Sequence, residues 1–152
     1  MRTFKDNADR QWTLAINVDT IRRVRAMLAV DLLEAVEGKL IERLVGDPIL
    51  LCDVIYVICK PEADQKSISD EDFGRAMAGD AIDLATSSLL EELVDFFPKN
   101  RRQLLAKALV KFRDLETKAI ELVNQQLDDP NLEAKLMSEL QRTLSLPRES
   151  GV

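Results

Sequence analysis

The chain has 152 residues, a net charge of −6, 46% hydrophobic residues and no histidine. This length suits one domain with a real core, and the missing histidine excludes Ser-His-Asp and Cys-His nucleophile pairs and histidine metal sites. The acidic balance disfavours nucleic acid as a partner, because nucleic-acid binding requires a cationic face. Charged residues make up 32% and aromatic residues 5%, a composition typical of a helical protein. We therefore expect an interaction protein rather than an enzyme.

Residues 3–16 differ from the rest of the chain in their periodicity. Trp12, Leu14 and Ile16 alternate with less apolar residues, and the turn-forming segment Asp6–Asp9 precedes them. This pattern predicts a small β-hairpin. An isolated hairpin is only marginally stable in water, so we expect the face that carries Trp12 to pack on the helices or on another subunit.

After the hairpin, apolar residues recur every three or four positions and predict seven helices. Asp19, Asp31, Asp47, Ser69 and Asp80 stand where N-caps are expected, and prolines and glycines mark the ends. A polar loop is predicted over residues 62–68, after Lys60-Pro61 ends the third helix. The predicted helices span residues 19–28, 31–45, 48–59, 69–79, 80–97, 100–127 and 131–144.

The third of these helices is apolar nearly all round, so we expect it to be central and buried, or to bury a second face in a partner. The predicted fold is mainly α, a compact domain of about six to seven helices with a small N-terminal β-hairpin. Residues 1–128 form the hairpin and helical domain. Residues 129–152 form a C-terminal helix and a loose tail attached to the same domain. We expect the narrow leucine row of that helix either to dock on the rest of the domain or to project and meet another chain.

Charge is unevenly distributed along the sequence. Residues 60–95 carry ten acidic and three basic residues, a net charge of −7, whereas residues 99–113 carry six basic residues and no acidic one. One interpretation is internal complementarity between two antiparallel helices on either side of Pro98. A second is head-to-tail self-association, which closes into a ring or continues as a helix. Nucleic acid on the basic stretch is the least favoured, because the nearby acids repel phosphates.

No motif for cofactor or metal binding is present, and we expect no cofactor. Cys52 and Cys59 are expected to be reduced thiols, as is usual in a cytosolic protein. Two helical turns separate their Cα atoms by roughly 10 Å, which is too far for an intrachain disulfide. Asp70-Glu71-Asp72 is interpreted as a helix start rather than a calcium loop. Asp53 is interpreted as an edge residue or a partner of Arg43, with a raised-pKa catalytic acid as the alternative.

Partner contacts are expected at aromatic and basic residues. Phe96-Phe97-Pro98 fits a core segment with a stop signal, and an exposed anchor for a partner is the alternative. The candidate partner-binding residues are Trp12, Phe96, Phe97, Arg101, Arg102, Lys107 and Lys111.

The order of these segments resembles that of phage and prophage tail assembly chaperones, which are small helical proteins encoded just ahead of the tape measure protein. The resemblance covers roughly residues 4–105 and does not include the long basic helix or the leucine-row helix beyond them. Its motifs are structural rather than catalytic. They are the hairpin Phe4–Ile16 with Trp12-Thr13-Leu14, Asp47-Pro48 with Leu51–Val57, Lys60–Asp64, Ser69–Gly74, and Leu89–Pro98 with Arg101-Arg102.

The resemblance implies a non-enzymatic protein that binds the tape measure protein, keeps it in solution and aids assembly of the tail tube. A tape measure or tail tube protein would be its partner, and such chaperones tend to self-associate into homo-oligomers. Many are also made in a longer form by ribosomal frameshifting. With no leader and no membrane-spanning run, the expected location is the cytoplasm of the bacterial host. The alternatives are a structural phage connector or tail completion protein, an unrelated helical adaptor, and a small enzyme with convergent carboxylates.

Overall fold

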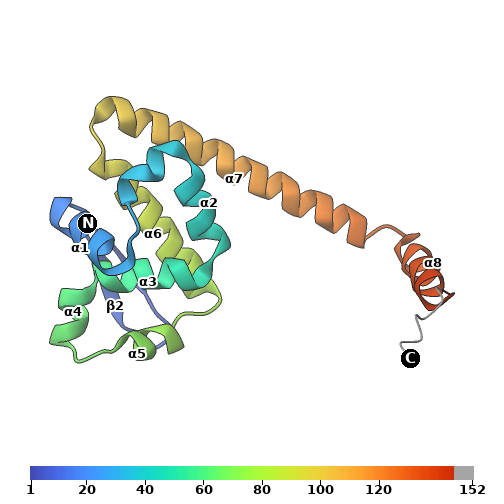
Figure 1. Ribbon diagram of the computed structural model, residues 1–152, viewed down its shortest axis with the longest axis horizontal. Helices are drawn as coiled ribbons and strands as arrows, with labels where there is room; N and C mark the ends of the chain where they lie inside the picture. Colours follow the sequence, from blue (N-terminus) through green and yellow to red (C-terminus); the bar gives the residue numbers. More distant parts are fainter. Residues whose placement is uncertain (146–152) are drawn as a thin grey trace, which may run out of the picture. The chain divides into compact units, whose positions relative to one another are not determined.

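The computed structural model describes residues 1–145, and this part of the chain contains a β-hairpin, eight α-helices and one 3-10 helix (Figure 1). The mainly α fold with an N-terminal hairpin is therefore confirmed. β1 (Arg2–Lys5) and β2 (Gln11–Leu14) pair antiparallel, with Phe4 opposite Trp12 on the buried face. The predicted loose tail lies outside the described residues. Within residues 1–145, no helix combines the length and the apolar character needed to cross a membrane.

The helices follow the predicted order, and several begin at predicted caps. The carboxylate of Asp31 accepts from the backbone N–H of Leu33, that of Asp47 from Ile49 and Leu50, and the hydroxyl of Ser69 accepts from Asp72. The helices are α1 (Val18–Leu28), η1 (Leu32–Glu37), α2 (Lys39–Gly46), α3 (Pro48–Ile58), α4 (Lys60–Gln65), α5 (Asp70–Arg75), α6 (Asp80–Phe96), α7 (Lys99–Leu127) and α8 (Leu132–Ser145).

Three of the predicted segments differ from the structure. The predicted helix over residues 69–79 ends at Arg75, and the other two differences each add a helix. The predicted helix over residues 31–45 is broken at Gly38, which adopts φ +83° and ends η1 before α2 begins. The predicted loop over residues 62–68 instead contains most of α4. Pro61 lies in the first turn of α4, where its missing N–H costs nothing, so it starts a helix as well as following one.

Two predicted caps are also wrong. The N-cap of α1 is Asn17, whose side chain accepts from Thr20, and Asp19 lies in the first turn. The N-cap of α6 is Gly79 at φ +59°, with no side-chain hydrogen bond, and Asp80 is the first helical residue. In both cases the acid still lies where it interacts favourably with the positive end of the helix dipole.

The core is built around α3, as expected from its apolar sequence. α3 contacts α1, α2, α4, α5 and α6, and its buried residues lie on several sides. On the hairpin side, the ring of Phe73 meets Trp12 edge to face at 5.3 Å and Tyr56 at 5.6 Å. Arg23 of α1 donates to the carbonyls of Val57 and Ile58, which the end of α3 leaves without helical partners.

The chain divides into two compact units. The first, Met1–Ala108, holds the hairpin, all helices up to α6 and the first part of α7, and the second begins at Leu109. The boundary therefore lies within α7, about twenty residues before the predicted boundary at residue 128. The boundary follows a change in burial and does not coincide with a loop, because no side chain from residue 110 to residue 145 is buried.

Candidate protein-interaction surface

Large apolar side chains are concentrated on the exposed surface of α7 and α8. Between residues 104 and 144, eleven of them each expose more than half of their surface. Such density is unusual for a soluble protein, in which scattered exposed leucines are ordinary but contiguous apolar surface marks a binding site. The eleven are Leu104, Val110, Leu115, Ile120, Leu122, Val123, Leu127, Leu136, Met137, Leu140 and Leu144.

Helical spacing places many of these residues on one side of each helix. In α7, Leu115, Ala119 and Leu122 follow one another at steps of four and three, and Val123 adjoins them. In α8, Leu136, Leu140 and Leu144 recur at steps of four, with Met137 beside them. We call the exposed apolar residues of α7 from Leu115 onward, together with those of α8, the distal apolar surface. The sequence signal of this surface, apolar periodicity, predicted both helices. It left open whether the leucine row of α8 docks on the domain or meets another chain.

The structure separates the seven predicted partner-binding residues into two groups. Trp12 has no exposed surface and Phe97 is buried, so neither offers a contact to a partner, and both expectations need correction. Phe96 is half-buried and meets the Phe97 ring edge to face at 5.3 Å. The four basic residues are exposed along α7. They are Arg101, Arg102, Lys107 and Lys111.

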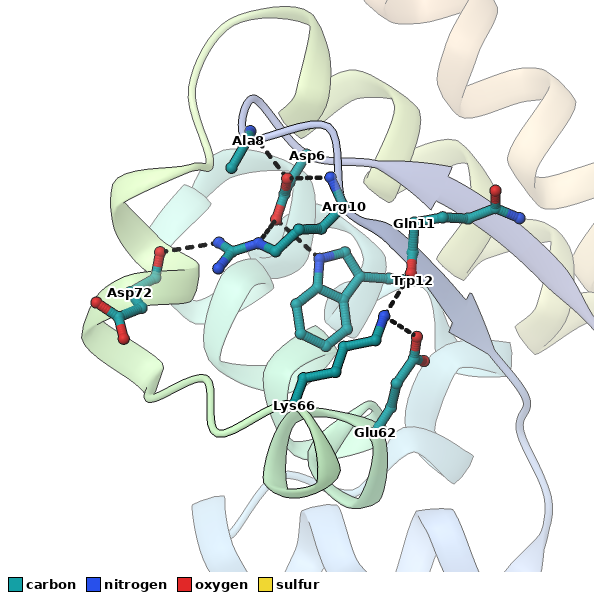
Figure 2. Close-up of polar contacts among 8 residues, drawn as sticks. All are labelled: Asp6, Ala8, Arg10, Gln11, Trp12, Glu62, Lys66 and Asp72. Carbon is teal, nitrogen blue, oxygen red and sulfur yellow. Dashed lines mark hydrogen bonds and ion pairs between the residues drawn. The ribbon is translucent and has the colours of Figure 1, made fainter.

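A buried carboxylate explains why Trp12 faces inward. Asp6, in the hairpin turn, accepts hydrogen bonds from the indole Nε1 of Trp12 at 2.9 Å and from the guanidinium Nε of Arg10 at 2.8 Å (Figure 2). It also accepts from the backbone N–H groups of Ala8 and Arg10. Burial alone raises the pKa of Asp6, but these hydrogen bonds outweigh burial, and the pKa lies below its usual value. The indole N–H is thus satisfied within the subunit.

The outer edge of β2 is also occupied within the subunit. Lys66 of α4 donates to the carbonyl of Gln11 and pairs with Glu62, as Figure 2 shows. Glu62 accepts from the backbone N–H of Thr13, and the Cys59 thiol lies 3.5 Å from the Thr13 carbonyl. A strand edge whose backbone groups are paired by side chains does not recruit a further strand. Strand addition at this edge is therefore disfavoured.

The acidic residues near the end of α6 pair with the hairpin rather than with the basic stretch that follows them. Arg2 of β1 contacts Glu91 at 2.7 Å, Glu92 at 3.0 Å and Asp95 at 2.7 Å. Glu92 also pairs with the N-terminal amine of Met1. Within residues 1–145, no ion pair joins an acid of residues 60–95 to a base of residues 99–113. Internal complementarity across Pro98 is therefore not observed.

The remaining titratable candidates do not converge on a reactive centre. Burial raises the pKa of Cys59 to about 12, so its thiol stays protonated, and burial likewise raises the pKa of the half-exposed Cys52. Asp53 is exposed at the edge of α3, as one of the interpretations expected, and no ion pair to Arg43 is present in the described part of the chain. The described residues contain no group of histidine, cysteine or acidic side chains that would hold a metal ion.

No protein-family model matches the sequence, and no curated protein or solved structure is significantly similar to it. The distal apolar surface and the basic residues of α7 are therefore the features from which a function has to be inferred.

Proposed function

We propose that this protein is a non-enzymatic phage or prophage tail assembly chaperone, which binds a tape measure protein and aids assembly of the tail tube. The observation that carries the proposal is the distal apolar surface, because exposed leucines on two helices suit a long helical client with its own apolar side. The resemblance of residues 4–105 to such chaperones supports the same function independently of this surface.

Binding of a helical client would cover the surface that the two helices leave open. Moving a leucine side chain from water into an apolar contact stabilises a complex by about 1.5–3 kcal/mol. Two leucines therefore account for roughly 3–6 kcal/mol, or at least a hundredfold in affinity. The positions on α7 that isolate this contribution are Leu115 and Leu122, which lie seven residues apart on one side of the helix.

The test is co-expression with the tape-measure-like protein encoded next to this gene, followed by affinity recovery of the tagged chain. The wild type is expected to keep the client in the soluble fraction and to recover it. L115E/L122E is expected to lose recovery at least a hundredfold. The matched control T117E/N124E adds two acids at the same seven-residue spacing on the opposite side of α7 and is expected to behave as the wild type. Equal recovery by L115E/L122E and the control contradicts the proposal, as does the absence of a long helical reading frame beside the gene.

A further inference from the structure

A groove in the first unit combines an apolar lining with one carboxylate, Asp53. It has a volume of about 220 Å³ and lies between the start of α3, the end of α5 and the start of α6. Ile49, Cys52 and Asp53 line it from α3, and Met77 and Ile82 line it from the opposite side. Ile49 exposes 75% of its surface, so the groove offers apolar area to a partner.

Asp53 lies in the groove, and two further carboxylates lie close to it. Burial raises the pKa of Asp53, and the nearby charges of Asp70 and Asp47 raise it further. Within residues 1–145, none of these three acids forms an ion pair with a basic side chain. Two bases of the same subunit pair with other acids: Arg75 contacts Asp72 at 2.8 Å and Glu71 at 3.7 Å. Lys60, whose charge interacts with that of Asp70, pairs with Asp64 at 2.8 Å. The carboxylate of Asp53 in the groove is therefore left without an ion-pair partner among the described residues of this subunit.

The first half of α7 presents the complementary pattern. Arg101, Leu104, Lys107 and Lys111 follow one another at steps of three and four, so they lie along one side of the helix. All four are exposed, and Leu105, which projects from another side, is buried. None of the three bases forms an ion pair among the described residues. We call these four residues the basic row.

The groove and the start of the basic row lie at opposite ends of α6. Ile82 is in the first turn of α6, whereas α7 begins directly after its last residue, Phe96. Fourteen residues of helix separate the two ends by about 21 Å. Figure 1 accordingly shows α5 and the start of α7 at opposite ends of α6. The start of the basic row is therefore remote from the groove of the same subunit.

We propose that the groove between α3, α5 and α6 binds the basic row of a second copy of this chain. Leu104 fits the apolar lining, and Lys107 and Lys111 meet the carboxylates of Asp53 and Asp70. Each copy offers both surfaces, at different places, so the contact is heterologous and continues from copy to copy as a ring or a helical filament. This contact uses none of the residues of the distal apolar surface, so it is independent of client binding.

Charge reversal tests the contact. Sedimentation velocity of the purified full chain at low salt is expected to show concentration-dependent association, weakened by 0.5 M NaCl. K107E/K111E and D53K/D70K are each expected to weaken association at least tenfold. An equimolar mixture of the two variants is expected to associate again, because the reversed row of one fits the reversed groove of the other. R22E/K39E has the same charge change as K107E/K111E on exposed residues elsewhere, and serves as the matched control.

A cross-link provides a second measurement that does not depend on the acidic variants. L104C places a thiol in the basic row, opposite the native thiol of Cys52 in the partner's groove. Under mild oxidation, L104C is expected to form covalent oligomers, and L104C/C52S is not. A monomeric wild type at high micromolar concentration overturns the proposal, as does a mixture of reversed variants that fails to associate. Loss of client recovery in K107E/K111E with unchanged association also overturns it, because the row would then bind the client.

Discussion

Replacing Asp6 with alanine tests the contribution of the hairpin turn to the stability of the first unit. The substitution removes one carboxylate that accepts four hydrogen bonds, including one from the fully buried indole N–H of Trp12. The guanidinium of Arg10 is partly exposed and regains water, but the indole N–H does not. A buried donor left without an acceptor costs about 1–3 kcal/mol, and loss of the charged pair adds to this.

We therefore expect D6A to lower the free energy of unfolding by about 3 kcal/mol, and the unfolding temperature by about 10 °C or more. Urea unfolding followed by the fluorescence of Trp12, the chain's single tryptophan, reports directly on this region. The matched control is D64A, which removes a carboxylate from an exposed pair with Lys60 and is expected to leave the midpoint nearly unchanged. If D6A and D64A unfold at the same urea concentration, burial of Asp6 does not contribute as inferred.

The pH dependence of D6N gives a second readout of the same site. Because the pKa of Asp6 is lower in the folded protein than in the unfolded chain, its ionisation stabilises the fold fully above the unfolded value of about 3.9. This stabilisation is lost as the pH falls through the folded value. The difference in stability between wild type and D6N should therefore be constant above about pH 5 and shrink in more acidic solution. A difference that stays constant down to pH 2 would refute this account.

Two further predictions concern the backbone and the thiols. G38A is expected to destabilise the protein by about 1 kcal/mol, because φ +83° strains any residue with a Cβ. G46A, at an unstrained and open position, is expected to stabilise the protein by about 0.5 kcal/mol. Urea midpoints that move in the same direction for both variants would contradict this reasoning. Iodoacetamide at pH 8 is expected to modify Cys52 slowly and Cys59 only after unfolding, because burial raises the pKa of Cys59 to about 12. Peptide mass spectrometry would show equal modification of both if this reasoning were wrong.

Local signals in the sequence were sufficient for most of the secondary structure. The alternation around Trp12, the Asp47-Pro48 start of α3 and the Ser69 cap of α5 involve residues within a few positions of one another. The structure has the strand and the starts of both helices as predicted. The backbone conformation at Gly38 and Pro61 was harder to predict from the sequence, because glycine and proline are each compatible with two local structures. A glycine tolerates both helical and left-handed backbone, and a proline both follows and begins a helix.

Only the tertiary structure decided which side chains are free to meet a partner. Trp12 looks like an anchor in the sequence, but the carboxylate of Asp6 and the ring of Phe73 hold it in the core. Periodicity makes the leucines of α7 look like core residues and leaves open whether the leucine row of α8 docks on the domain or meets another chain. From Leu115 onward, all leucines of these two helices except the half-buried Leu132 are exposed. Periodicity establishes that one side of a helix is apolar, whereas burial depends on whether another element lies against that side. Sequence alone therefore determined the helices and their charges, and long-range packing determined which of their surfaces remain open.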